Sequence, residues 1–296
     1  MFGGYWSFLP CLFGRIFNTP CFIILGGTDC VAFPSLRYGS LQKKILKQFI
    51  KWSYQLATCL LPVHESLVFS SYKYYEKSKY KTQGYRFFFP NIKTPYKVIY
   101  NGFELEKFKF ELPLTKKKNS FITVAGISDF RRFKLKGIDK LIELAKRNPK
   151  DSFKVIGMSD TFKNTLNDIP NNVELLPFLS ATEFKHHLFE SEFYLQLSIS
   201  EGFPNALCEG MLCGCIPIGS TVGAVPHIIG DAGFLIESSN TDFILKRVAE
   251  IKKMGEAEKK NLSLEARQRI IDNFDIKKRE QLFLQTIENH IEGTVQ

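Results

Sequence analysis

This chain of 296 residues contains no apolar run of the roughly 20 residues that a helix needs to cross a bilayer. Its apolar N-terminal segment, MFGGYWSFLPCLFGRIFNTPCFIILGG, has no Lys or Arg before the apolar part and is interrupted by Pro10 and Arg15. These features argue against a membrane span and against a targeting signal. We expect the segment to form a core strand and loop of a soluble domain, with an apolar face that can touch a membrane.

The seven cysteines lack the spacing of a metal site, because only one residue separates Cys213 from Cys215 and no histidine cluster accompanies them. An odd number of cysteines without a regular framework favours free, buried thiols in a reducing compartment. The chain also has no Asp-x-Asp pair of the kind that holds a metal-bound nucleotide. We therefore expect no metal and no other cofactor.

Acidic residues are fewer than basic ones, 30 against 40, which gives a formal net charge of +10. This excess favours an anionic partner: a phosphorylated ligand, an anionic membrane surface or a nucleic acid. Because the charges are spread and no RNA- or DNA-binding motif is present, we expect no nucleic-acid partner. The basic amphipathic segment 43–51 (KKILKQFIK) is expected to pack on its own domain, with a membrane surface as the alternative. We expect a cytoplasmic protein, with peripheral contact at the inner membrane face left open.

From residue 121 onward, short apolar runs alternate with helical patterns, which predicts βαβ units and a parallel sheet with helices on both faces. The expected strands lie at 121–126, 153–157, 173–177, 193–198, 215–220 and 233–236. The chain from 241 is expected to be helical with a break near Asn273 and Phe274. The first 110 residues are less regular, with strands expected near 21–25, 59–63 and 97–103 and helices at 40–57 and 64–75.

The stretch SISEGFPNALCEGM (198–211) follows an expected strand and begins a helix near Pro204. It therefore lies at the carboxyl edge of the sheet, where open α/β sheets bind ligands. Free N–H groups at the start of a helix favour an anion such as a diphosphate. Glu201 and Glu209 can accept hydrogen bonds from ligand hydroxyls. On these residues alone, a helix cap and a solvated helix residue are equally good interpretations.

The sequence resembles the retaining GT-B glycosyltransferases, especially glycosyltransferase family 4 (glycosyl transferases group 1). EGFPNALCEGM (201–211), CGCIPIGS (213–220) and VGAVP (222–226) resemble the family's run around its E-x7-E pair. FITVAGISDFRRFKLKGIDKLIELA (121–145) resembles the opening of its second domain, and KVIYNGF (97–103) the end of its first. GGTDC (26–30) resembles an acceptor-domain turn in some members.

The resemblance implies a GT-B fold, an α/β architecture of two Rossmann-like domains with parallel sheets that face a cleft. The domains would span 1–112 and 121–275, with a linker at 113–120 and a last helix at 276–296 that crosses back to the first domain. The family's opening strand and glycine-rich loop have no counterpart before MFGGYW. We therefore expect an incomplete N-terminal domain, in either a compact variant or a truncated enzyme.

The implied activity is transfer of a sugar from a nucleotide-sugar donor to an acceptor hydroxyl, on a polysaccharide or lipid-linked glycan, with retention and without a metal. Two alternatives remain open: a catalytically impaired nucleotide-sugar-binding remnant and a GT-B sugar-nucleotide epimerase.

The resemblance also assigns roles to individual residues. The catalytic candidates are Glu201 on the transferred sugar, Lys136 on the leaving diphosphate, and Arg132 (or Arg131) in place of the family's arginine, which falls at Ile127. The donor-binding candidates are Glu209 on the ribose together with Gly126, Gly202, Phe203, Asn205, Ala206 and Leu207. The acceptor-side candidates are Gly27, Asp29 and His64. His227 stands where the family usually has a glutamate.

Overall fold

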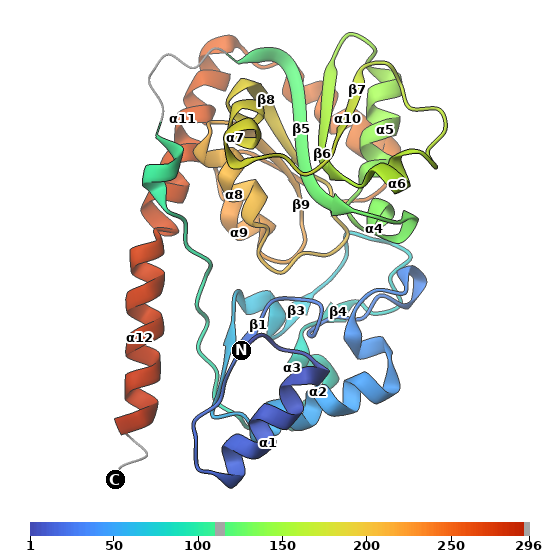
Figure 1. The fold of residues 1–296 in the computed structure, drawn as a ribbon. Coiled ribbons are helices and arrows are strands. Elements are labelled where there is room, and N and C mark those ends of the chain that lie inside the picture. Colours follow the sequence, from blue (N-terminus) through green and yellow to red (C-terminus); the bar gives the residue numbers. More distant parts are fainter. Residues whose placement is uncertain (110–115, 293–296) are drawn as a thin grey trace.

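The structure, a computed structural model, describes residues 1–109 and 116–292. Its elements form two lobes, which lie one above the other in Figure 1. The upper lobe is built on a six-stranded sheet, and the lower lobe holds two separate two-stranded sheets. Within the described residues, every helix is too short or too polar to cross a membrane.

The upper sheet is parallel throughout and has the strand order β7-β6-β5-β8-β9-β10. Its strands are β5 (Lys117–Ile127), β6 (Ser152–Met158), β7 (Val173–Leu176), β8 (Ser191–Gln196), β9 (Ile216–Ser220) and β10 (Phe234–Ile236). All six expected strands are confirmed to within a few residues. Because β5 is the first strand of this lobe, the order is that of the doubly wound nucleotide-binding sheet, and it reverses between β5 and β8.

Two groups of helices surround this sheet. One pairs α5 (Ile138–Arg147) with α10 (Thr241–Lys252), and the other gathers α7 (Ala181–Glu190), α8 (Asn205–Leu212) and α11 (Glu256–Asn273). Shorter helices are α4 (Phe130–Leu135), α6 (Asp160–Lys163) and α9 (Val225–Ile229). The expected apolar stripe of α5 is buried, and the stacked rings of Phe121, Phe153 and Phe193 fill the centre of the sheet. Burial of these side chains is the main stabilising contribution to the lobe.

The lower lobe has a small parallel sheet of β1 (Phe22–Leu25) and β2 (Cys59–Pro62). Single parallel bridges extend it on both sides, from Phe2 to Ile24 and from Leu60 to Tyr96. The helices are α1 (Phe8–Ile16), α2 (Lys44–Leu56) and α3 (Tyr85–Phe88), and β3 (Ser70–Ser71) pairs with β4 (Thr82–Gln83). Short 3-10 turns lie at Tyr5–Ser7, Pro34–Leu36, Ser40–Gln42, Glu65–Leu67 and Leu105–Phe108. This sheet is much smaller than that of the upper lobe.

Three expectations for the lower lobe are wrong, the first of them only in part. The N-terminal segment contains the expected strand, β1, but Phe8–Ile16 form helix α1, and Pro10 falls in the first turn of this helix, where its missing N–H costs nothing. Residues 64–75 are not a helix, because the hydroxyl groups of Tyr72 and Tyr74 bond to the main chain of the other lobe and hold the segment extended. Residues 97–103 do not form a strand. They make two backbone hydrogen bonds to β2, from Lys97 and Ile99, and one isolated bridge, from Phe103 to Asp275.

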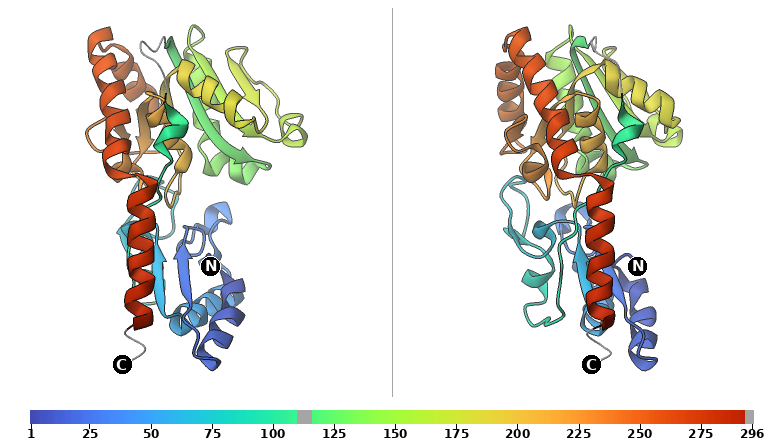
Figure 2. Two further views of the ribbon diagram at one scale, coloured as in Figure 1. Left: turned by 60° about the vertical axis from the view of Figure 1, so that its left-hand side comes forward. Right: turned by 90° about the vertical axis from the view of Figure 1, so that its left-hand side faces the viewer.

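The expected break after Asn273 is confirmed, and α12 (Ile276–Glu292) then runs down beside the lower lobe (Figure 2). Leu282 and Phe283 of α12 pack against the buried residues Cys59, Leu61 and Ile99. In the segment expected to be a linker, 117–120 are already part of β5, and 113–115 lie outside the described residues. All seven cysteines are buried and free, as expected.

Candidate active site

The centre of the candidate site is an ion pair between two loops of the upper lobe. The Nζ atom of Lys136 lies 2.6 Å from the Oε1 atom of Glu201. Lys136 follows β5 and Glu201 follows β8, the two neighbouring strands between which the strand order reverses. Gln196, the last residue of β8, donates from Nε2 to the same carboxylate oxygen at 3.0 Å. The switch point of the sheet therefore brings the two residues together.

Lys136 stays cationic in this position. Burial disfavours its charged form, but the ion pair and hydrogen bond with Glu201 outweigh that effect, so the pKa of Lys136 is raised. A partly dehydrated ammonium group interacts with a nearby anion more strongly than an exposed one does. Lys136 is thus suited to stabilise negative charge on a bound ligand.

Gly137, the residue after Lys136, has a backbone conformation that favours glycine. It precedes α5 with a left-handed backbone (φ 71°), a conformation that glycine adopts without steric cost. A Cβ atom here would lie 2.2 Å from the carbonyl oxygen of Leu197, just after β8. The glycine lets the chain turn into α5 against the end of β8, which places Lys136 beside Glu201.

Helix α8 begins at Asn205, shortly after Glu201 in the sequence. Pro204 precedes the helix, and no side chain caps it. Leu207 N–H bonds to the Pro204 carbonyl, so Asn205 and Ala206 are the residues whose N–H groups have no intrahelical acceptor. The Leu207 side chain is fully buried in the core, so only its backbone can face a ligand.

Glu209 lies one turn further along α8 and is half-buried. Burial raises the pKa of its carboxyl group. Within the part of the chain that the structure describes, this side chain makes no hydrogen bond and no ion pair. Its acceptor capacity is therefore available to a ligand.

The two lobes touch beside this site through their glycines. A Cβ atom at Gly202 would lie 2.1 Å from the Gly26 carbonyl oxygen and 3.4 Å from Gly27 Cα. Next to Gly202, the ring of Phe203 is buried and stacks on Tyr100 of the lower lobe, with 6.2 Å between centroids. Asn101 Nδ2 donates to Asn205 Oδ1 at 2.8 Å. The lower lobe thus fixes the loop that carries Glu201.

A cavity of about 420 Å³ lies between the lobes. Its upper wall includes Gly126, Arg131, Arg132 and Lys136, and its lower wall includes Thr28, Arg37, Tyr38 and Lys43. Arg132 Nη1 donates to the Gly126 carbonyl at 3.4 Å, which turns that guanidinium toward the end of β5. The basic residues make the cavity suitable for an anionic ligand. The sequence patterns did not indicate Arg37, Tyr38 or Gln196, because each falls outside a recognisable motif, and Lys43 was noted only as part of the basic segment 43–51.

The three acceptor-side candidates lie in different surroundings. Gly27 contacts Gly202. The carboxylate of Asp29 is enclosed, accepting from Tyr54 Oη at 2.6 Å and from the Gly27 N–H at 3.2 Å, and burial raises its pKa. His64 is 91% buried, and its ring faces His227 of α9 at 5.3 Å between centroids. The structure therefore does not bring these three residues together around one ligand position.

Comparison with known families gives a match that covers more than half of the chain. The model of the family described as glycosyl transferases group 1 matches residues 105–272. An uncharacterized glycosyltransferase of Methanocaldococcus jannaschii is 31% identical over 122 residues, which cover 39% of this chain and 34% of that protein. N-acetyl-alpha-D-glucosaminyl L-malate synthase of Bacillus anthracis is 34% identical over 86 residues, 28% of this chain and 22% of the enzyme. The matched segments thus span about a third or less of these relatives.

Solved structures share the fold over nearly all of the chain. Sucrose-phosphate synthase of Thermosynechococcus elongatus has a TM-score of 0.74 at 14% identity, covering 97% of this chain and 72% of that one. HepE of Anabaena has a TM-score of 0.70 at 15% identity, with 96% and 75% covered. TarM of S. aureus has a TM-score of 0.68 at 15% identity, with 93% and 53% covered. The fold is therefore GT-B, and the chain belongs to the glycosyl transferases group 1 family.

Proposed function

We propose that this protein is a retaining glycosyltransferase of family 4 that transfers a sugar from a nucleotide-sugar donor to an acceptor hydroxyl. The observation that carries the proposal is the Lys136–Glu201 pair beside the uncapped start of α8, with the unpartnered Glu209 one turn further on. A nucleotide sugar has sugar hydroxyls, a diphosphate and ribose hydroxyls in that order. The site offers two carboxylates for the two sets of hydroxyls and positive charge for the diphosphate.

In this proposal Lys136, Arg132 and the N–H groups of Asn205 and Ala206 hold the diphosphate. Negative charge grows on the diphosphate as the bond from the sugar's anomeric carbon breaks, so fixed positive groups stabilise the transition state. Glu201 accepts from hydroxyls of the transferred sugar, and Glu209 accepts from the ribose. Because side chains and a helix terminus supply the positive charge, we propose that no metal is needed for the transfer.

The bond changes follow from retention of configuration. The acceptor oxygen forms its bond to the anomeric carbon on the face from which the diphosphate departs. The acceptor's proton moves to an oxygen of the leaving diphosphate, so that the products are the glycosylated acceptor and a nucleoside diphosphate. Glu201, which is tied to Lys136 and Gln196, orients the sugar during this exchange.

We propose a uridine diphosphate sugar as the donor and a glycan or lipid-linked acceptor. HepE of Anabaena has been solved in complex with UDP and glucose and in complex with UDP-glucose. A TarM mutant of S. aureus has been solved with UDP, alpha-GlcNAc-glycerol and Fondaparinux. The acceptor would enter from the lower lobe, past Gly27 and toward Lys136. Polysaccharide biosynthesis in the cytoplasm is the setting that fits this chemistry.

We also propose peripheral contact between the lower lobe and an anionic membrane. Large apolar side chains in and next to α1 and α2 are at least 41% exposed: Phe2, Trp6, Leu9, Phe13, Ile16, Phe17, Ile45 and Trp52. Helix α2 also carries Lys44, Lys47 and Lys51, and basic surfaces with exposed aromatic rings bind anionic headgroups. Sedimentation with anionic vesicles tests this idea. Phe17→Ser should reduce binding, whereas Leu284→Ser on α12 should not, and equal binding by both variants would reject it.

The function itself is tested by incubating the purified protein with UDP-sugars, with and without glycan acceptors, and separating the products. Transfer to an acceptor with the same anomeric configuration as the donor supports the proposal. Isomerised donor would identify a sugar-nucleotide epimerase instead. Donor binding without transfer or hydrolysis would identify a catalytically impaired nucleotide-sugar-binding protein.

A further inference from the structure

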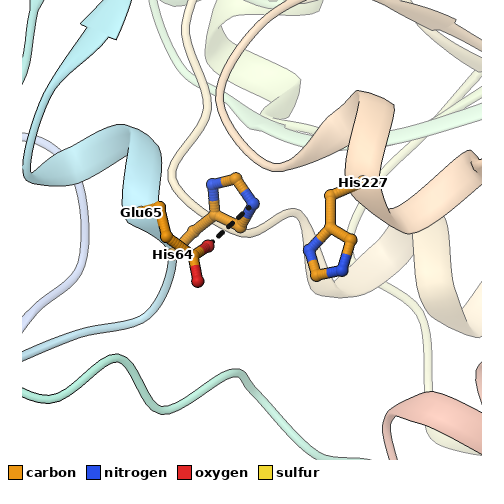
Figure 3. A group of neighbouring side chains, drawn as sticks. All are labelled: His64, Glu65 and His227. Atoms are coloured by element: carbon orange, nitrogen blue, oxygen red, sulfur yellow. Dashed lines mark ion pairs between the residues drawn. The ribbon is translucent and has the colours of Figure 1, made fainter.

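Three potential metal ligands meet where the two lobes touch. His64 and Glu65 lie at the start of the 3-10 turn Glu65–Leu67 in the lower lobe, which His64 precedes, and His227 belongs to α9 in the upper lobe. Figure 3 shows the imidazole of His64 between the carboxylate of Glu65 and the ring of His227. One atom from each of the three side chains lies within 4.8 Å of the other two.

The spacing is close to that of a tetrahedral metal site. The Nε2 atom of His64 lies 3.4 Å from the Oε2 atom of Glu65. Zinc bonds to nitrogen and oxygen are about 2.0–2.2 Å long, so two ligands of a tetrahedral site lie roughly 3.3–3.6 Å apart. The His64–Glu65 pair already has this spacing, and a movement of about 1 Å by the His227 ring completes it. Two histidines and one glutamate form a set that Zn²⁺ accepts while a fourth position stays open.

Neighbouring groups orient each ligand. Tyr100 Oη donates to the other oxygen of Glu65 at 2.6 Å. The Nδ1 atom of His64 accepts from the Ser66 N–H at 3.1 Å, and Ser66 Oγ lies 2.9 Å from the same atom. Metal binding at Nε2 would put the ring proton on Nδ1, where Ser66 Oγ can accept it. The Nδ1 atom of His227 is buried and has no hydrogen-bond partner in the described part of the chain. A buried polar atom without a partner is costly, and a bound cation would remove that cost.

We propose that His64, Glu65 and His227 bind a divalent transition cation of the Zn²⁺ class, which clasps the two lobes together. The half-exposed carboxylate of Glu65 provides the entry path, with 56% of its side chain accessible. Arg269, whose guanidinium lies near His227, donates to the main-chain oxygens of His227 and Ile228 at 2.6 and 2.7 Å. The cluster is linked to the loop that carries Glu201 through Tyr100, whose ring contacts His64 and stacks on Phe203.

The test is a titration of EDTA-treated protein with ZnCl₂, with MgCl₂ as the comparison, followed by calorimetry and by thermal unfolding. We expect saturable binding of one Zn²⁺ and a higher Tm with Zn²⁺ but not with Mg²⁺. His227→Ala should weaken Zn²⁺ binding at least about tenfold. His186→Ala is the matched control, because His186 is an exposed helical histidine that pairs with Glu190 at 3.5 Å.

The wild-type chain also provides a readout that needs no variant. Co²⁺ in place of Zn²⁺ should give the visible absorption of a four- or five-coordinate site, and Zn²⁺ should displace it. Hydrogen exchange of 64–67 and of 225–229 should slow together when Zn²⁺ binds. The proposal is overturned if Zn²⁺ does not bind, if His227→Ala binds it as tightly as wild type, or if exchange slows in one lobe alone.

Discussion

Lys136 and Glu201 are 65 positions apart in the sequence, and their side chains form a hydrogen-bonded ion pair of 2.6 Å. The pair exists because β5 and β8 are neighbours in the upper sheet and both loops leave the same edge. Gly137 and Gly202 allow the backbones to approach there. A cation and a carboxylate are thus held where an anionic, hydroxyl-rich ligand fits.

The first prediction concerns Lys136. Lys136→Met should lower kcat for sugar transfer about 10²- to 10³-fold, because a fixed positive group next to the leaving diphosphate is lost. Lys146→Met on α5, the helix that begins just after Lys136, is the matched control, since Lys146 is half-exposed and pairs with Glu143. Steady-state kinetics of both variants checks the effect. An unchanged kcat in Lys136→Met would remove this residue from the transition state.

A second prediction concerns the glycine contact between the lobes. Gly202→Ala places a methyl group about 2 Å from the Gly26 carbonyl oxygen, so the lobes must separate. We expect a loss of roughly 1–3 kcal/mol in the free energy of unfolding and a lower kcat/KM. Urea unfolding and kinetics test this. Gly255→Ala is the control, because a methyl group there meets nothing within 4 Å. Equal stability of the two variants would contradict the close packing.

A third prediction concerns acid stability and His64. Burial lowers the pKa of His64 to about 4 against a usual value of 6.5, with Glu65 opposing and His227 reinforcing the shift. Below about pH 6.5 the unfolded chain takes up a proton that the folded chain excludes, so stability falls as the pH drops toward 4.

The acid-stability prediction is tested with His64→Gln in metal-free buffer. Wild type should lose up to about 3 kcal/mol more than the variant between pH 7 and pH 4, at roughly 1.4 kcal/mol for each pKa unit. Chemical unfolding at both pH values measures the difference. Parallel curves for the two proteins would show that His64 titrates normally.

The upper lobe was largely predictable from sequence. Its strands are short β-branched or aromatic runs, and its helices carry clear apolar stripes, so local pattern and tertiary structure agree. The strand order, and with it the Lys136–Glu201 contact, depends on which strands pair. The resemblance implied roles for both residues, but no local pattern showed that they bond to each other.

The lower lobe was harder to predict because contacts distant in sequence determine its structure. The segment from His64 to Tyr75 has a helical pattern, yet Tyr72 Oη bonds to the Ile199 carbonyl at 2.6 Å and the chain stays extended. Arg37 and Tyr38 enter the cavity through a turn in which Arg37 has a positive φ of 49°. No periodicity indicates such a turn, so these residues were not identified.

The central claim is that the donor nucleotide binds along α8, between Lys136 and Glu209. Isothermal titration of UDP into wild type, Glu209→Ala and Glu190→Ala tests it most directly, with Glu190 as a half-exposed glutamate on α7. A hydrogen bond to a charged group contributes about 1.5–3 kcal/mol, so Glu209→Ala should weaken UDP binding roughly 10- to 100-fold. Glu190→Ala should bind UDP as wild type does. The same affinity for UDP in Glu209→Ala and wild type would contradict the assignment of the donor site.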